Sequence, residues 1–597
     1  MCGIVGYSGK NGNCLPVIIS GLEALEYRGY DSAGIAYKKD NIINIVKEKG
    51  KIVNLKNELN MDIKSNLGIG HTRWATHGKP TKENSHPHKV GKITLVHNGI
   101  IENYIELKSK LIKDGYKFIS DTDTEVACAL IDSLYNGDIL ETIEKAIKKM
   151  RGSFAFGLLV DGDDYLYATR LTSPLIIAEG VDENYIASDV PAILKYTNKY
   201  MLLNDYDIAK IGSNDITVYN NLKEVKRDIL TFEGNMEAGM KNGYDHFMLK
   251  EINEQDRVIK NTISYYFDGT IESLIRNIPD LTKYNKIDIV ACGSAYHTGL
   301  VGKCLIEKFA DIPVNCEVAS EYRYKRSFYD EKTLVILVSQ SGETADTLAA
   351  LRKAKEDGID TLAIVNVVGS SIAREAKYVL YIKAGCEIAV ATTKAYTAQL
   401  SIFSLIAIYL AYTKKLLNNV ELDEIIKEIN DLPDIINKTL KNTDYINIAN
   451  KIYKRNDIFF IGRGIDYALS MEGSLKLKEI SYINSVAYAA GELKHGTISL
   501  IEKGTPVIAI STDKDLTEKT ISNIKEVKAR DAYTLFVTND YVNGDFYDDI
   551  IVVDKVHELL QPIITIIPLQ LLSYEVAKLN NCDIDKPRNL AKSVTVE

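Results

Sequence analysis

MCGIVGY, residues 1–7, is the stretch that decides the fold of the first third of the chain. If Met1 is removed, Cys2 becomes the amino terminus, and its thiol then lies beside an α-amino group with a pKa of about 8. Ile4 to Tyr7 are mostly apolar and predict a buried strand that holds this terminus in place. The pattern predicts one residue that carries both a nucleophile and its base. The alternative is an incidental cysteine at the second position.

Composition indicates a soluble globular protein of several domains. The chain has 597 residues, of which 46% are hydrophobic and 26% charged, so about three domains are expected. A formal net charge of -9 and the lack of a long Lys/Arg block argue against nucleic acid as a partner. Small molecules are the expected partners.

Cysteine use and hydropathy indicate the compartment. Eight cysteines are scattered without metal-site spacing, and no signal peptide precedes Cys2, so we expect a reducing cytoplasm. The longest apolar run, residues 398–412, is shorter than the roughly 20 residues that cross a membrane and predicts a buried core helix. His86 and His88 have no third ligand nearby, so neither a metal nor another cofactor is predicted.

Polar residues of the first third concentrate in residues 71–78 (HTRWATHG), 96–99 (VHNG) and 120–125 (SDTDTE). A cysteine that attacks an amide needs donors for an oxyanion, and Asn98 and Gly99 can supply a side-chain amide and a backbone N–H. Arg73 can bind the carboxylate, and Asp123 the ammonium, of a free amino acid such as glutamine. These segments therefore predict an amide-hydrolysing site.

Each of these residues also has a structural alternative. Asn98-Gly99 is a strong hairpin-turn signal, Thr122 or Asp123 can cap a helix predicted for residues 126–134, and Arg73 can be a surface charge. Taken singly, the alternatives are the better interpretation.

Five segments taken together resemble the class II glutamine amidotransferase family: MCGIVGY, LEYRGYDSAG, GIGHTRWATHG, HNGIIENY and SDTDTEV. The resemblance implies an α/β fold of the N-terminal-nucleophile type, with two stacked sheets between helix layers. It implies Cys2 as the glutaminase nucleophile and Asn98 and Gly99 as the oxyanion hole. The residues that it implies for glutamine binding are Arg73, Trp74, Thr76, His77 and Asp123.

Beyond a junction at about residues 231–255, the chain repeats an α/β plan. Predicted strands at 287–291 and 457–461 each end at a glycine-containing turn. Further apolar strands follow at 333–338 and 361–367 in the first half, and at 506–511 and 533–537 in the second. This alternation predicts two doubly wound parallel sheets with ligands at the carboxyl ends of the strands.

Ser339-Gln340-Ser341-Gly342-Glu343-Thr344 follows one of these strands and opens a predicted helix. Backbone N–H groups and hydroxyls at a helix start form a cradle for a phosphate. The segment lacks the lysine of a Walker loop, so a monophosphate is expected rather than a nucleoside triphosphate. An ordinary Ser/Thr N-cap is the alternative.

In the second half, Lys476 and Glu479 are three residues apart and share one face of a predicted helix. Such a pair suits proton movement between neighbouring carbons of a sugar, and a surface ion pair is the alternative. Lys478 lies off that face and is expected to be a solvated charge.

The two halves resemble the sugar isomerase (SIS) family, whose phosphosugar signature is a strand followed by S-x-S-G-x-T. With ELKHG at 492–496 and DKPRNLAKSVTVE at 585–597, the resemblance covers the whole chain. The chain is identified as a member of the amidotransferases that convert a ketose phosphate into an amino sugar phosphate. This implies L-glutamine and D-fructose 6-phosphate as substrates, D-glucosamine 6-phosphate and L-glutamate as products, and a homodimer.

The resemblance also implies residue roles in the sugar site. Lys592 forms an imine with the open-chain sugar, Glu479 moves the C1/C2 proton with help from Lys476, and His495 assists ring opening. The residues implied for sugar-phosphate binding are Cys292, Gly293, Ser294, Ser339, Gln340, Ser341, Thr344, Val390 and Lys592. The expected domains are an amidotransferase at 2–217, a linker with connecting helices at 218–276, SIS domains at 277–416 and 448–588, and a catalytic tail at 589–597.

The chain departs from the family at Ser294-Ala295, where Thr-Ser is common, and so lacks one hydroxyl near the phosphate. No long insertion separates the amidotransferase and SIS parts, which resembles the compact prokaryotic form. Two other classes remain open. A different Cys2 amidotransferase acting on a phosphosugar would need a diphosphate-binding site in place of SQSGET, and a SIS sugar-phosphate sensor would not need Cys2.

Overall fold

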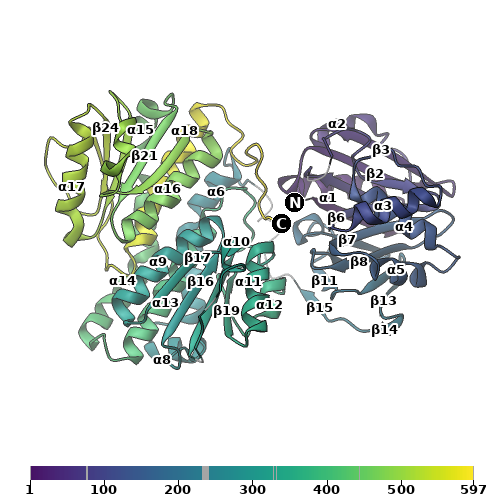
Figure 1. The fold of residues 1–597 in the computed structure, drawn as a ribbon, viewed down its shortest axis with the longest axis horizontal. Coiled ribbons are helices and arrows are strands. Elements are labelled where there is room, and N and C mark those ends of the chain that lie inside the picture. Colours follow the sequence, from purple (N-terminus) through teal and green to yellow (C-terminus); the bar gives the residue numbers. More distant parts are fainter. Residues whose placement is uncertain are drawn as a thin grey trace. The chain divides into compact units, whose positions relative to one another are not determined.

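The computed structural model describes residues 2–75, 78–231, 241–326, 328–330, 332–442 and 444–595. The chain forms two compact units, which are residues 1–239 with 591–597, and residues 240–590 (Figure 1).

The first unit contains two antiparallel sheets. The strands of its eight-stranded sheet, in spatial order, are β15 (Ile229–Thr231), β11 (Lys199–Leu202), β9 (Ile176–Glu179), β10 (Glu183–Ala187), β1 (Gly3–Gly9), β4 (Leu67–Arg73), β2 (Ser32–Lys39) and β3 (Ile42–Lys49). Those of the seven-stranded sheet are β14 (Lys223–Val225), β13 (Ile216–Asn220), β12 (Ile208–Ile211), β8 (Leu166–Leu171), β7 (Gly152–Val160), β6 (Ile93–Ile101) and β5 (His88–Val90). Buried side chains such as Ile4, Val96 and Ile186 form the core between the sheets.

Helices cover the outer face of each sheet in this unit. On one side lie α1 (Cys14–Ala24) and α2 (Ile52–Glu58), and on the other lie α3 (Tyr104–Lys113), α4 (Asp123–Leu134) and α5 (Ile139–Ile147) (Figure 1). Helix α1 packs on β1 and β4 because its apolar residues recur at helical spacing and are buried. The predicted four-layer αββα arrangement is confirmed. Strand β1 is buried throughout and lies between β10 and β4, so the start of the chain is held at the centre of a sheet.

The second unit contains two five-stranded parallel sheets with the same strand order, which confirms the internal repeat. The first sheet is β17 (Val314–Val318), β16 (Lys286–Ala291), β18 (Thr333–Ser339), β19 (Asp360–Val365) and β20 (Tyr378–Tyr381). The second is β22 (Asn484–Ala489), β21 (Asp457–Gly462), β23 (Pro506–Ser511), β24 (Tyr533–Thr538) and β25 (Asp549–Val552). Their α-helices are α6 (Phe247–Asn253), α7 (Gln255–Tyr266), α8 (Ile271–Asn277), α9 (Gly293–Ala310), α10 (Ala319–Tyr322), α11 (Ala345–Glu356), α12 (Ser371–Glu375), α13 (Lys394–Thr413), α14 (Asn419–Lys441), α15 (Asp444–Ile452), α16 (Ile465–Ser481), α17 (Lys514–Lys528) and α18 (Gln561–Leu579).

Helices α9, α13, α16 and α18 form the shared core of the two repeats. Helix α13 contains the apolar run at 398–412, and its prediction as a core helix is confirmed. By length and composition α13 and α18 would be able to cross a membrane, but 94% and 83% of their most apolar stretches are buried inside the protein.

The limits of the sequence-predicted domains stay predictions. Strands β14 and β15 extend the sheets of the first unit beyond residue 217, and helices α6 to α8 belong to the second unit. Residues 232–240 of the proposed linker lie outside the described residues.

Candidate active site

Cys2 precedes β1, and its thiol contacts the backbone of Trp74. The Trp74 N–H donates to Cys2 Sγ at 3.2 Å, and the thiol donates to the Trp74 carbonyl oxygen at 3.5 Å. Burial raises the pKa of the Cys2 thiol, so the group keeps its proton at neutral pH and needs a base before it can attack. Arg28, which forms a 2.8 Å ion pair with Asp189, donates from Nε to the Cys2 carbonyl oxygen at 3.3 Å.

Asn98 and Gly99 lie within β6, paired with β7, so the hairpin-turn alternative is wrong. Asn98 Nδ2 donates to the Cys2 carbonyl oxygen at 2.9 Å. Gly99 has φ +125°, and a Cβ there would lie 2.1 Å from the Ser153 carbonyl oxygen, so no residue with a side chain fits without a backbone shift. The structure thus brings Asn98 to the backbone of Cys2.

Arg73 is 3% exposed at the end of β4, so its interpretation as a surface charge is wrong. Its guanidinium donates to the carbonyl oxygens of Gly78 at 3.2 Å and Lys79 at 3.4 Å. Asp123 opens α4, and its Oδ2 accepts from the Ile101 N–H at 2.8 Å. The capping alternative holds for Thr122, whose side chain accepts from the N–H of Glu125, and not for Asp123.

Trp74 is half-buried and meets Tyr30 edge to face, with 5.9 Å between ring centroids. The next residue, Ala75, donates its N–H to Asp31 Oδ2 at 2.9 Å, which anchors the segment after β4. Thr76 and His77, predicted to bind glutamine, lie outside the described residues.

Sequence reasoning missed a buried histidine cluster in this unit. The rings of His71 and His86 stack with 4.1 Å between centroids, and His97 Nδ1 lies 3.0 Å from Thr124 Oγ1. Burial lowers the pKa of His71 to about 3 and those of His86 and His88 well below their usual value. The rings are therefore neutral at physiological pH. Part of the signal was available, because His71 and His97 lie within the motifs that contain Arg73 and Asn98.

In the second unit, Ser339 ends β18 and Thr344 precedes α11. Their hydroxyls are 3.0 Å apart, and Ser339 Oγ also accepts from the Gly342 N–H at 3.0 Å. Thr344 occupies the N-cap position of α11, as the alternative interpretation predicts. Its side chain, however, makes no capping hydrogen bond. Gln340, Ser341 and Thr344 are half-buried. The turn is built as a compact loop that leaves these side chains partly accessible.

The other predicted phosphate-binding turn follows the neighbouring strand. Strands β16 and β18 are parallel and pair Ala291 with Val338, so the turns after them lie at the same edge of the sheet. Cys292 is the N-cap residue of α9, with Sγ 3.8 Å from Thr347 Oγ1, and Gly293 and Ser294 follow it. Gly293 has φ +56°. Val390 is 8% exposed, and its N–H donates to the Asp585 carbonyl oxygen at 3.0 Å.

Lys476 is 1% exposed on α16, so the surface ion-pair alternative is wrong. Its Nζ lies 2.5 Å from Glu479 Oε2 and 3.5 Å from Glu472 Oε1. Burial alone would lower the pKa of Lys476, but the Glu479 and Glu472 carboxylates outweigh it and raise the pKa. Lys478 is exposed, as expected. Sequence reasoning missed Glu472, although it precedes Lys476 by four residues and so shares its helix face.

The two remaining predicted residues lie on short segments. His495 is exposed in a 3₁₀ turn, Leu493–His495, of the second unit. Lys592 is partly buried, and residues 591–597 are grouped with the first unit.

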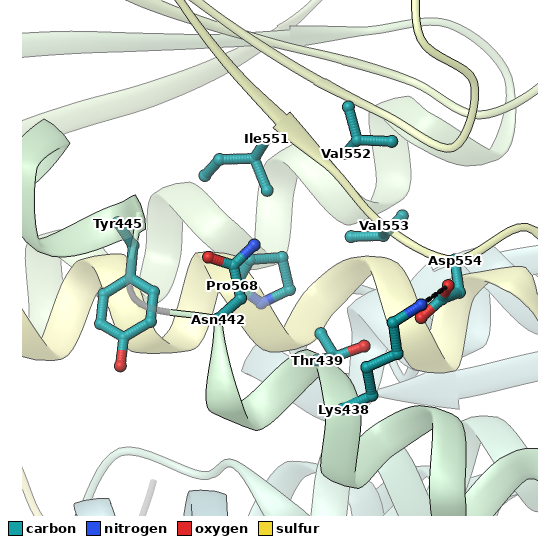
Figure 2. A pocket seen from close by; sticks show the side chains of 9 residues that line it. All are labelled: Lys438, Thr439, Asn442, Tyr445, Ile551, Val552, Val553, Asp554 and Pro568. Carbon is teal, nitrogen blue, oxygen red and sulfur yellow. Dashed lines mark hydrogen bonds and ion pairs between the residues drawn. The ribbon is translucent and has the colours of Figure 1, made fainter.

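A cavity of about 100 Å³ lies between α14, β25 and α18. Figure 2 shows the lining side chains, with Lys438 pointing toward Asp554 and Pro568 on α18. Lys438 Nζ lies 2.5 Å from Asp554 Oδ1. A water occupies roughly 30 Å³ of the liquid, so the cavity has room for a few waters only. None of the predicted site residues lines it.

Comparison with known proteins identifies relatives of both units. The family described as "SIS domain" matches residues 280–409 and 451–579, and the family described as "Glutamine amidotransferase domain" matches residues 71–195. The chain is 51% identical to glutamine–fructose-6-phosphate aminotransferase (isomerizing) of Clostridium tetani and 43% identical to that of Thermus thermophilus, and each alignment covers 100% of both chains. The solved C-terminal domain of glucosamine-fructose-6-phosphate aminotransferase from Francisella tularensis covers 58% of this chain and 99% of its own, with a TM-score of 0.55 and 39% identity. The chain belongs to the glutamine–fructose-6-phosphate aminotransferase (isomerizing) family.

Proposed function

We propose that this chain transfers the amide nitrogen of L-glutamine to D-fructose 6-phosphate and isomerises the product to D-glucosamine 6-phosphate, releasing L-glutamate. The observation that carries the proposal is 51% identity over the full length of an enzyme named for this reaction. The contacts of Cys2 in one unit and of Lys476 in the other support it, because they suit an amide-cleaving group and a proton-transfer pair.

In the first half-reaction, the Cys2 thiolate attacks the side-chain carbonyl carbon of glutamine. The α-amino group that is exposed when Met1 is removed takes the thiol proton and passes it to the departing ammonia. Asn98 Nδ2, which donates to the Cys2 carbonyl oxygen at 2.9 Å, and the Gly99 N–H stabilise the oxyanion. Water then hydrolyses the thioester to glutamate. Arg73 and Asp123 hold the carboxylate and ammonium of glutamine, with Trp74, Thr76 and His77 beside them.

In the second half-reaction, the turns at Cys292–Ser294 and Ser339–Thr344 hold the phosphate, and Val390 completes the sugar site. His495 assists ring opening, and Lys592 forms an imine with the open-chain ketose. Ammonia displaces the lysine, and Glu479 then moves a proton from C1 to C2. Lys476, 2.5 Å from Glu479, is placed to assist this transfer.

We also propose a homodimer in the cytoplasm. His495 is exposed in the protomer, which supports its contribution to a site of a second copy. All eight cysteines are free thiols, which suits a reducing compartment.

The function is tested by incubating the protein with glutamine and fructose 6-phosphate. Glutamate and glucosamine 6-phosphate are expected in equal amounts. Glutamate without amino sugar would support a different amidotransferase, and sugar-phosphate binding without turnover would support a sensor. The role of Lys592 is tested by borohydride reduction with fructose 6-phosphate, which should leave a hexitol phosphate on the peptide that contains Lys592 and none in Lys592→Arg.

A further inference from the structure

His297 of the first repeat is joined to Lys476 of the second through a buried carboxylate. His297 lies on α9, and Glu472 and Lys476 lie one turn apart on α16, which packs against α9. The His297 Nδ1–H donates to Glu472 Oε2 at 2.7 Å. Glu472 is 0% exposed and His297 is 8% exposed, so water does not screen this contact. His297 is not one of the site residues described above.

The two oxygens of the Glu472 carboxylate make different contacts. Its Oε2 accepts the histidine hydrogen bond, whereas its Oε1 is 3.5 Å from Lys476 Nζ. Among the described residues, Oε1 has no hydrogen-bond partner. Lys476 makes its close contact with Glu479 instead, at 2.5 Å. The lysine is therefore held between two carboxylates and is closer to Glu479.

The position of the Lys476 ammonium between Glu479 and Glu472 depends on the charges around it. Glu479 and Glu472 on its own helix, and Glu387 from the segment before α13, all favour its charged form. The Tyr396 hydroxyl on α13, buried near Glu472, has no hydrogen-bond partner in the part of the chain that the structure describes. A Glu472 released from His297 would be attracted to the Lys476 ammonium, because two opposite charges in a buried site attract strongly. It would then compete with Glu479.

We propose that His297 is a positioning residue for the isomerisation step. By donating a hydrogen bond to Oε2 of Glu472, His297 keeps that carboxylate from forming a close ion pair with Lys476. The Lys476 ammonium then keeps its close contact with Glu479. The inference rests on the proposed function, in which Glu479 and Lys476 move the C1/C2 proton. His297 itself touches neither the sugar nor the reacting atoms in this role.

The test compares His297→Asn with His297→Leu. The two replacements have nearly the same shape, but only the asparagine amide can donate to Glu472 from about the position of Nδ1. His297→Leu is expected to lower kcat for glucosamine 6-phosphate formation by roughly ten- to hundredfold, the effect of losing a hydrogen bond to a charged group. KM for fructose 6-phosphate and the glutaminase rate should stay within about twofold of wild type. His297→Asn should retain most of kcat.

Three results would overturn the proposal: equal kcat in the two variants, a loss confined to KM, or an unchanged kcat in His297→Leu. If His297→Leu does not fold, the double variant His297→Leu/Glu472→Gln tests the proposal instead. An uncharged residue 472 no longer competes with Glu479 for the Lys476 ammonium. Activity close to that of Glu472→Gln alone supports the proposal, and a further tenfold loss overturns it. A wild-type protein that forms no glucosamine 6-phosphate would instead reject the proposed function.

Discussion

His71 Nε2 lies 3.1 Å from Asn98 Oδ1, and this contact determines which way the Asn98 amide faces. The same ring nitrogen lies 3.0 Å from the His97 carbonyl oxygen, which can only accept, so Nε2 carries the hydrogen. The Asn98 oxygen therefore faces His71, and its Nδ2–H donates to the Cys2 carbonyl oxygen at 2.9 Å. A neutral histidine thus orients the donor that we propose for the oxyanion.

Asn98→Ala is expected to lower kcat for glutamine hydrolysis by about 10² to 10³, the usual effect of removing one oxyanion-hole donor. The matched control is Asn103→Ala. Asn103 also bonds backbone groups, through Nδ2 to the Lys149 carbonyl oxygen and through Oδ1 to the Arg151 N–H. The control should lose stability but keep its glutaminase rate. Wild-type hydrolysis by Asn98→Ala would remove Asn98 from the oxyanion hole.

Cys2→Ala is expected to abolish glutamine hydrolysis and leave fructose 6-phosphate binding intact, because Cys2 and the turns that we propose for sugar-phosphate binding lie in separate compact units. Mass spectrometry of the active wild-type protein should find a chain that begins at Cys2, since a retained Met1 would convert the proposed base into an amide. Glutamine hydrolysis that persists in Cys2→Ala would mean that another group is the nucleophile.

Ser341→Ala and Thr344→Ala are each expected to raise KM for fructose 6-phosphate by roughly ten- to hundredfold, the effect of losing one hydrogen bond to a charged group. The glutaminase rate should hardly change. Thr517→Ala is the matched control, because its hydroxyl is 3.1 Å from Ser511 Oγ in the second repeat, as Thr344 is 3.0 Å from Ser339 in the first. An unchanged KM in both test variants would place the phosphate elsewhere.

Local patterns in the sequence predicted the elements that carry the site. The alternation of apolar strands and helices located β1, β16, β18, β21 and β23, because strand and helix periods are properties of neighbouring residues. The motif at residues 96–99 contained two conflicting local signals, a hairpin turn and an oxyanion pair. The structure excludes the hairpin turn, because long-range pairing of β6 with β7 outweighs the turn preference of Asn-Gly.

Contacts between distant residues were not predictable in the same way. His297 and Glu472 are 175 residues apart, and only the packing of α9 on α16 brings them together. The burial of Arg73 and Lys476 likewise depends on neighbouring elements, which a count of charges along the chain does not contain. Their burial changes their interpretation, because a buried charge needs a partner and a surface charge does not.

The stability of the first unit should fall with pH below about 6.5. An unfolded histidine titrates near 6.5, whereas the folded pKa is about 3 for His71 and well below the usual value for His86 and His88. Between these values the unfolded state binds more protons, so the free energy of unfolding rises with pH. From pH 6.5 to 5, His71 should lower the free energy of unfolding by about 1 to 2 kcal/mol, and His86 and His88 should lower it further.

Urea unfolding monitored by tryptophan fluorescence measures this change in the first unit, because Trp74 is the only tryptophan in the sequence. His88→Gln, which keeps a polar group near Thr122 Oγ1 but cannot titrate, should reduce the pH dependence of the unfolding free energy. A pH-independent unfolding free energy in the wild type would contradict neutral buried histidines.

Trp74→Ala is expected to uncouple the two half-reactions. Under the proposed function, ammonia formed at Cys2 must reach the sugar unprotonated, because water near pH 7 converts nearly all of it to ammonium, which is not a nucleophile. The Trp74 backbone contacts the Cys2 thiol through both its N–H and its carbonyl group, and its half-buried indole meets Tyr30 edge to face. A large ring at this position is suited to keeping ammonia that forms at Cys2 away from water.

A core tryptophan would give a different result, because its truncation would destabilise the unit by about 3 to 5 kcal/mol and reduce both activities together. The half-buried position of Trp74 argues against that role. Trp74→Ala should therefore keep its melting temperature and its glutaminase rate but form much less glucosamine 6-phosphate per glutamate. Trp74→Phe, which keeps an aromatic ring against Tyr30, serves as the control and should stay closer to one product per glutamate. A ratio of one in Trp74→Ala would show that the indole does not retain ammonia.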